Sequence, residues 1–89
     1  MNISRAEQRA LHVLALGGLI RHERACGRKV SEVTCFTREG AVLSDCDLRV
    51  FQSLRRKGLI ESRNGAPYRI SLRGRRMVRA QHDNQGGMA

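Results

Sequence analysis

Four polar residues in the second half of the chain follow the spacing i, i+3, i+4 and i+7, which places their side chains on one face of a helix. They are Arg49, Gln52, Ser53 and Arg56. An arginine can donate two hydrogen bonds to guanine, and a glutamine can both donate to and accept from adenine, so this face predicts contact with base edges. Any exposed helix face can carry these residue types, and a solvated surface is the alternative interpretation.

Positive charge is concentrated in the C-terminal third of the chain. The 89 residues contain 17 Lys and Arg against 8 Asp and Glu, a formal net charge of +9, and residues 55–79 alone hold nine cations and one anion. Such a localised charge predicts a polyanionic partner: nucleic acid, an acidic protein surface or an anionic membrane. The candidate binding residues of this segment, besides the helix face, are Lys57, Arg63, Arg69, Arg73, Arg75 and Arg76.

No set of residues predicts catalysis or a bound cofactor. Three cysteines and a histidine have the residue types of a zinc site, namely Cys26, Cys35, Cys46 and His22. The sequence has no Cys-x-x-Cys pair, however, and single cysteines are common in small cores. No nucleophile can be placed beside a base, and phosphate-binding glycine motifs are absent from the sequence. We therefore expect neither an enzyme nor a metal or cofactor site.

The amino-acid composition restricts the size of the fold, its relation to membranes and its cellular compartment. Apolar residues make up 40% of the chain, enough for one modest core, and the length is that of a single domain. No apolar run approaches the roughly 18 to 20 residues of a membrane span, and no secretory signal is recognisable at the start. An odd number of cysteines suits a reducing compartment. We expect a cytoplasmic protein with no membrane partner.

The first half of the chain predicts one helix followed by strands. A Ser-x-x-Glu capping box starting at Ser4 indicates the helix start, and a Gly-Gly pair at 17–18 indicates its end. Leu19–Arg24 and Val30–Phe36 are short segments rich in apolar or β-branched residues, and residues 41–43 form a third. This order predicts a small antiparallel meander.

The second half predicts a helix and a hairpin. Segment 45–57 has anions at its start and cations at its end, as the dipole of a helix favours. Asn64-Gly65 lies between two extended segments, 59–63 and 66–70. Because both residues of an Asn-Gly pair tolerate positive φ, this pair is a strong signal for a type I′ hairpin turn.

Tyr68 is the one aromatic residue predicted outside the core. Binding of single-stranded nucleic acid by base stacking needs several aromatic platforms, and one is too few. We therefore expect Tyr68 to pack beside the hairpin.

The predicted fold class is α+β, a small winged-helix-like domain with the order α β β β α β β α and antiparallel strands. Ser71 is expected to cap the last helix; residues 1–80 form the single domain and residues 81–89 a disordered tail. The basic helix would take the recognition position of a winged helix, and the Asn-Gly hairpin would be the wing. A standard winged helix has a further helix where residues 19–43 are predicted to be extended. That helix normally supports the recognition helix across the DNA backbone, so its absence argues against reading of the major groove.

Several motifs in a fixed order carry a resemblance to a known family. They are Ser4-Arg5-Ala6-Glu7-Gln8-Arg9, Leu11-His12-Val13-Leu14-Ala15, Gly17-Gly18, Val50-Phe51, Leu59-Ile60, Asn64-Gly65-Ala66-Pro67-Tyr68-Arg69-Ile70 and Val78-Arg79-Ala80-Gln81. Together they resemble the YjhX family of small bacterial proteins, the TopAI-like toxins. The resemblance runs from the first helix to about Asn84.

The resemblance implies a toxin-like inhibitor that binds bacterial DNA topoisomerase I and interferes with its engagement of DNA. It also implies a second partner, an acetyltransferase-like antitoxin encoded beside the toxin, and DNA is a further candidate partner. It carries over no site residues, so the candidates above rest on charge and exposure alone. The alternative interpretation is a winged-helix transcriptional regulator that reads bases with the helix face and holds phosphates with the hairpin.

Overall fold

The computed structural model describes residues 2–24 and 30–87, with the side chains of the last helix described as far as Arg79. Helices and strands follow one another in the order α β β β α β β α, and all strand pairs are antiparallel, which confirms the predicted α+β class. In the described part of the chain, no helix is long and apolar enough to cross a membrane.

Helix α1 spans Arg5–Ala15 and begins with the predicted capping box. The backbone N–H of Glu7 donates to Ser4 Oγ (3.2 Å), and the Ser4 N–H donates to Glu7 Oε1 (2.9 Å). Both bonds satisfy N–H groups that the first turn of a helix leaves free, so they fix where α1 starts. The helix ends at Ala15, and its C-cap Leu16 directly precedes Gly17, whose φ of 111° favours glycine.

Strands β1 (Leu19–Arg24), β2 (Val30–Phe36) and β3 (Val42–Leu43) form one antiparallel sheet in the order β1-β2-β3, which confirms the predicted meander. On its other edge β1 meets the second sheet through a single bridge. There the N–H of Ile20 donates to the carbonyl of Tyr68 (2.9 Å), and the N–H of Tyr68 donates back to Ile20 (2.8 Å). The first strand therefore joins the two sheets.

Strands β4 (Ile60–Glu61) and β5 (Arg69–Ile70) form the predicted hairpin. Asn64 and Gly65 have φ values of 54° and 77°, so both adopt the left-handed conformation expected of the Asn-Gly turn. Each strand has two residues and is shorter than predicted. Pro67 contributes to this difference, because proline has no N–H to donate to a neighbouring strand.

Helix α2 spans Leu48–Arg56, and Asp47 is its N-cap. The Asp47 carboxylate accepts a hydrogen bond from the backbone N–H of Val50 (2.9 Å). The helix begins later than the sequence predicts, because Asp47 caps it whereas Asp45 forms an ion pair with Arg9 of α1.

Helix α3 spans Leu72–Gly87 and is capped as predicted by Ser71, whose Oγ accepts a hydrogen bond from the N–H of Gly74 (3.1 Å). The helix continues past position 80, at which the sequence predicts the end of the domain. The predicted tail, 81–89, ends in two residues outside the described part, and the side chains of all nine also lie outside it. The domain boundary stays a prediction.

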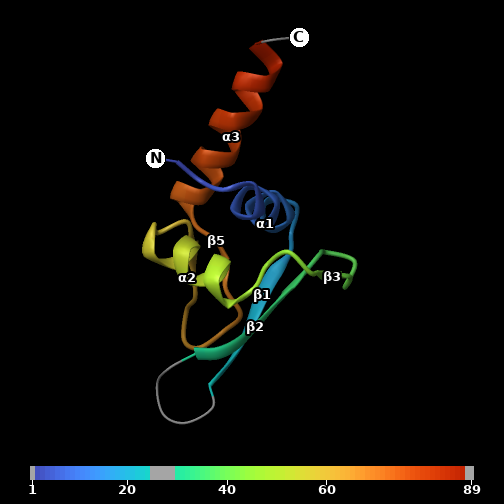
Figure 1. Ribbon diagram of the computed structural model, residues 1–89, viewed down its shortest axis with the longest axis vertical. Coiled ribbons are helices and arrows are strands. Elements are labelled where there is room, and N and C mark those ends of the chain that lie inside the picture. Colours follow the sequence, from blue (N-terminus) through green and yellow to red (C-terminus); the bar gives the residue numbers. More distant parts are fainter. Residues whose placement is uncertain (1, 25–29, 88–89) are drawn as a thin grey trace.

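The core lies where the helices meet the inner faces of the strands. Phe51 and Leu54 of α2 and Leu11 of α1 are fully buried there. Tyr68 is 7% exposed and meets Phe51 edge to face, with ring centroids 4.9 Å apart. The prediction that Tyr68 lies outside the core is therefore wrong, because its ring packs inward against α2. Figure 1 shows the β1–β2 ribbon reaching away from this core at one end of the molecule and α3 leading away at the other.

Candidate functional site

The predicted base-reading face of α2 is exposed at three of its four residues. Arg49, Gln52 and Arg56 are exposed, and Ser53 is half-buried. The Ser53 hydroxyl donates a hydrogen bond to Glu7 Oε2 at 2.9 Å, across the contact between α1 and α2. Ser53 therefore belongs to an internal contact, and three residues remain available to a partner on this face.

Lys57, a second candidate binding residue, also turns into the protein. Its Nζ donates to Glu7 Oε2 (2.9 Å), to Glu7 Oε1 (3.2 Å) and to the carbonyl of Asn2 (2.9 Å). Burial alone would raise the pKa of Glu7, but the Ser4 N–H, the Lys57 ammonium and the Ser53 hydroxyl stabilise its carboxylate and lower the pKa to about 2. Lys57 is thus the internal partner of a buried acid.

Arg63 and Arg73 have local contacts of different kinds. Arg63, next to the hairpin turn, lies 3.8 Å from Glu61 in an exposed ion pair. Arg73, in the first turn of α3, donates from Nη1 to the carbonyl of Lys57 at 3.3 Å. The start of α3 therefore lies beside the end of α2, and the Arg73 guanidinium has no acid within 4 Å among the described side chains.

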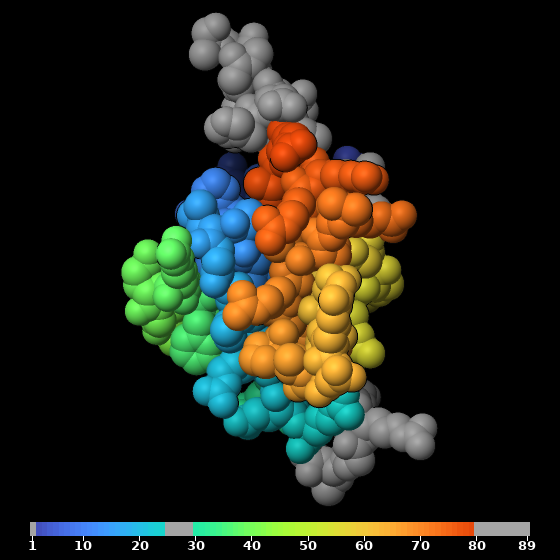
Figure 2. Space-filling model, turned by 180° about the vertical axis from the view of Figure 1, so that it is seen from behind, coloured from blue at the N-terminus to red at the C-terminus, as the bar shows by residue number. Residues whose placement is uncertain are grey.

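Five exposed arginines on β5 and α3 have no acid within 4 Å among the described side chains. We call this set the cationic surface: Arg69, Arg73, Arg75, Arg76 and Arg79. Figure 2 shows the hairpin and the first part of α3 as one continuous strip over the middle of one face of the molecule. The structure thus brings four predicted site residues together on neighbouring elements and adds Arg79.

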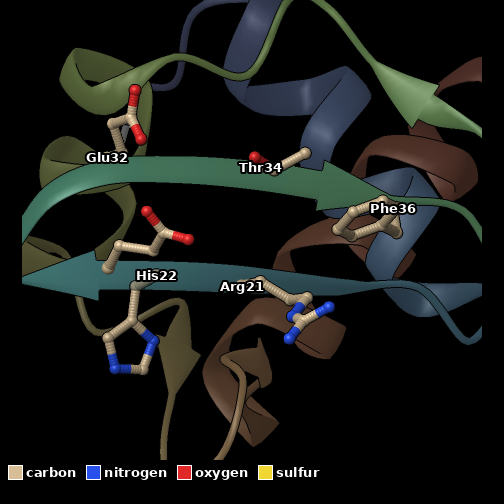
Figure 3. Close-up of a pocket in the computed structure, with 6 residues that line it drawn as sticks. Arg21, His22, Glu32, Thr34 and Phe36 are labelled. Carbon is tan, nitrogen blue, oxygen red and sulfur yellow. The ribbon is translucent and has the colours of Figure 1, made fainter.

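The β1–β2 ribbon carries a hollow of about 220 Å³ that the sequence did not indicate. It is lined by residues of both strands, shown in Figure 3: Arg21, His22, Glu23, Glu32, Thr34 and Phe36. The hollow mixes charged, polar and aromatic groups. The segment Leu19–Arg24 has two apolar residues followed by four polar or charged ones, so it shows no alternation that would have pointed to this hollow.

No group of three potential metal ligands gathers in the part of the chain that the structure describes. Two of the cysteines considered for zinc, Cys35 and Cys46, are buried in the core. The third, Cys26, lies outside the described residues.

Comparison with known proteins decides the family. Residues 1–85 match the family YjhX_toxin, described as "Putative toxin of bacterial toxin-antitoxin pair". The chain belongs to this family. It is 65% identical over 86 residues to a UPF0386 protein of Rhodospirillum rubrum, which covers 97% of this chain and 96% of the relative. It is also 70% identical over 86 residues to a UPF0386 protein of Cereibacter sphaeroides, which covers 97% and 99%. No solved structure matches the chain.

Membership in the YjhX toxin family confirms the resemblance noted in the sequence. A toxin of a toxin–antitoxin pair has at least two interactions, one with its target and one with its antitoxin. The candidate surfaces must therefore be weighed against two partners.

Proposed function

We propose that this protein is a toxin that binds bacterial DNA topoisomerase I through its cationic surface and blocks the action of the enzyme on DNA. The supporting observation is the set of exposed arginines on β5 and α3 that have no acidic partner among the described side chains. Unpaired guanidinium groups on neighbouring elements favour a partner that supplies carboxylates or phosphates.

The sign of the net charge restricts how the protein can inhibit the topoisomerase. A protein that imitated DNA would be acidic, whereas this chain carries a net charge of +9. The cationic surface therefore docks on an acidic surface of the topoisomerase and occludes or locks the enzyme. Complementary charge would also speed the encounter and make binding sensitive to salt.

The proposed antitoxin is acetyltransferase-like, and the chemistry of this chain restricts how it can act. Acetylation removes the charge of a lysine, but the cationic surface consists of arginines only. The sequence has two lysines; Lys57 is bound to Glu7, and Lys29 lies outside the described residues. Acetylation therefore leaves the cationic surface intact, and we expect the antitoxin to neutralise the toxin by binding it.

A relaxation assay with purified topoisomerase I and supercoiled plasmid tests the proposal. The wild-type chain should inhibit relaxation and remain bound to the enzyme after nuclease treatment. The double variant R75E/R76E should need at least about tenfold more protein for the same inhibition, because it reverses two charges of the cationic surface. The variant R24E/R38E, which changes net charge equally at exposed positions elsewhere, should inhibit like wild type.

Two results would contradict the proposal. One is the lack of any complex with the topoisomerase at low salt. The other is a complex that disappears when nuclease removes DNA, because the association would then be bridged by nucleic acid.

A winged-helix DNA-binding regulator is the second candidate function, and the exposure of Arg49, Gln52 and Arg56 on α2 favours it. This function requires duplex binding that weakens steeply with salt and prefers one sequence by roughly 10³ or more over random DNA. In place of the bracing helix of a standard winged helix, the described residues between α1 and α2 form the strands β1, β2 and β3, which weighs against this function. Fluorescence anisotropy with selected and random duplexes separates the two candidates.

A further inference from the structure

The register of the first sheet places three cross-strand pairs on the outer side of the β1–β2 ribbon. Side chains of directly paired residues lie on the same side of a sheet, and every second residue returns to that side. The three pairs are Leu19 with Phe36, Arg21 with Thr34, and Glu23 with Glu32. Figure 3 shows Arg21, Thr34 and Phe36 along the two strands. We call these six residues, together with Val42, the ribbon face.

The first pair belongs to an apolar row that crosses all three strands. Phe36 pairs with Leu19 on one side and with Val42 on the other, so the three side chains share the outer side of the sheet. Leu19 and Phe36 are half-buried, and Val42 is 61% exposed. Apolar side chains gathered in a partly exposed row are typical of an interaction surface.

The third pair brings two like charges together. Glu23 lies directly opposite Glu32. Directly opposed like charges destabilise an antiparallel pair, and neither carboxylate has a cation within 4 Å among the described side chains. Arg21, two residues before Glu23, also forms no ion pair there.

Most of the other described acids have a partner within the protein, unlike Glu23 and Glu32. Glu7, Asp45 and Glu61 each form an ion pair, and Asp47 caps α2. Glu39, in the turn before β3, forms no ion pair among the described residues, and neither do the two acids of the ribbon face. Among the described side chains, the acids with neither an ion pair nor a capping role are therefore Glu23, Glu32 and Glu39, all between β1 and β3.

The pairs and the hollow define the chemistry of a complementary partner. Successive pairs on one side of a ribbon are about 6.6 Å apart, which is also the repeat of alternate side chains in an extended segment. A matching segment presents an apolar side chain over Phe36 and Val42, an acceptor to Arg21, and a basic side chain between Glu23 and Glu32. The hollow of about 220 Å³ gives room for side chains of this size.

We propose that the ribbon face is the docking surface for the antitoxin, which binds it with an extended segment carrying an apolar, an acceptor and a basic side chain in alternate positions. This inference rests on the membership of the chain in a toxin family and is independent of topoisomerase I as the target. The cationic surface consists of arginines alone, whereas the ribbon face has two acids and an apolar row, so under this proposal target and antitoxin bind different residues of the toxin.

A second copy of this chain is a weaker candidate for the same surface. Two molecules with a net charge of +9 each repel one another, and that repulsion opposes self-association at low salt. If the cationic surface of one copy docked on the ribbon face of the next, the contact would be head to tail. The first and last copies of the assembly would each keep one open surface, so the assembly would grow without closing.

Binding of the purified protein encoded beside the toxin gene tests the proposal, measured by calorimetry against the full-length toxin. The double variant E23K/E32K and the single variant V42D should each weaken binding at least about tenfold. Two control variants should bind like wild type: E61K, which reverses a single exposed acid on the hairpin, and R75E/R76E of the cationic surface. All positions are exposed, and thermal unfolding confirms that each variant folds.

Each other outcome overturns the proposal. If R75E/R76E loses binding while E23K/E32K keeps it, the antitoxin covers the cationic surface. If wild-type toxin does not bind the neighbouring protein, or E61K weakens binding as much as E23K/E32K, the ribbon face has no such role. If sedimentation shows that the wild-type toxin forms oligomers and that the E23K/E32K variant is monomeric, a second copy of the toxin occupies the ribbon face. Relaxation assays with E23K/E32K keep this result separate from the proposed function, because this variant should still inhibit topoisomerase I.

Discussion

Lys57 Nζ lies 2.9 Å from Glu7 Oε2 and connects the first turn of α1 to the C-terminal end of α2, fifty positions apart in the chain. The Glu7 carboxylate also accepts hydrogen bonds from the Ser4 N–H and the Ser53 hydroxyl. Its side chain is 7% exposed, so these donors replace the water that the carboxylate loses on folding. One acid thereby caps α1 and fixes α2 against it.

Replacing Glu7 by alanine should destabilise the fold by about 3 kcal/mol. The change leaves the Lys57 ammonium and the Ser53 hydroxyl without their partner in a partly buried site and removes half of the capping box. Arg9→Ala, which breaks the exposed pair with Asp45, is the control and should cost less than about 1 kcal/mol. Urea denaturation followed by circular dichroism measures both, and equal losses would show that the contact of Glu7 is no stronger than a surface pair.

Stability should fall with acid in a range set by Glu7. Its folded-state pKa of about 2 lies below the ordinary value of 4.5, so the folded state favours the charged carboxylate. The stabilisation is therefore complete above about pH 5 and is lost as the pH falls from 4.5 towards 2, by up to about 3 kcal/mol. Urea midpoints between pH 2 and 7 check this. Glu7→Gln should flatten the profile in that range; an unchanged profile would assign the acid sensitivity to other groups.

Local signals in the sequence were sufficient to predict most of the fold. The capping box at Ser4, the Asn64-Gly65 turn and the Ser71 cap each depend on residues within a few positions, and each is present in the structure. The start of α2 was predicted too early, because two aspartates compete for the cap. The choice depends on Arg9, which engages Asp45 from another helix.

The surroundings of the candidate site depend on contacts that the sequence does not reveal. A helical wheel places Ser53 on the polar face of α2, but it does not show that α1 packs there and supplies Glu7. From the sequence, Lys57 is an ordinary cation at the C-terminal end of a helix. Only the structure shows that its ammonium contacts Glu7 and the carbonyl of Asn2. The arginines predicted on β5 and α3, Arg69, Arg73, Arg75 and Arg76, are exposed in the structure, since a guanidinium group needs no partner to remain on the surface. Their role in binding stays a prediction.

Replacing Gly74 by alanine should destabilise the protein although alanine favours a helix. A methyl group at this position would lie 2.2 Å from the carbonyl oxygen of Leu59 and 2.7 Å from Ile70 Cγ1. The clash with a backbone atom forces α3 away from the hairpin and should cost about 1 to 3 kcal/mol, more than the roughly 1 kcal/mol gained from helix propensity. Thermal unfolding measures the change. The exposed neighbour Arg75→Ala should stay within about 0.5 kcal/mol of wild type, and a stabilised Gly74→Ala would contradict this packing.

The thiols of Cys35 and Cys46 should resist chemical labelling in the folded protein. Cys35 pairs with Leu43 across β2 and β3, and the N–H of Cys46 donates to the carbonyl of Leu43 at 3.4 Å, which brings the two buried thiols together. The hydrogen bond with Cys35 and burial both raise the pKa of Cys46. Because the thiolate is the reactive form, the raised pKa slows reaction of Cys46, and burial away from water slows reaction of both thiols.

A variant with Cys26→Ser contains only these two cysteines. Its reaction with a disulfide reagent at pH 8 should be at least about a hundredfold slower in the native state than in urea, since labelling requires opening of the core. Adding Val42→Cys, at a position 61% exposed, provides the control and should introduce one thiol that reacts at the unfolded rate. Rapid labelling of the native Cys26→Ser variant would mean that the region between β3 and α2 opens readily, in which case its packing contributes little to the stability of the domain.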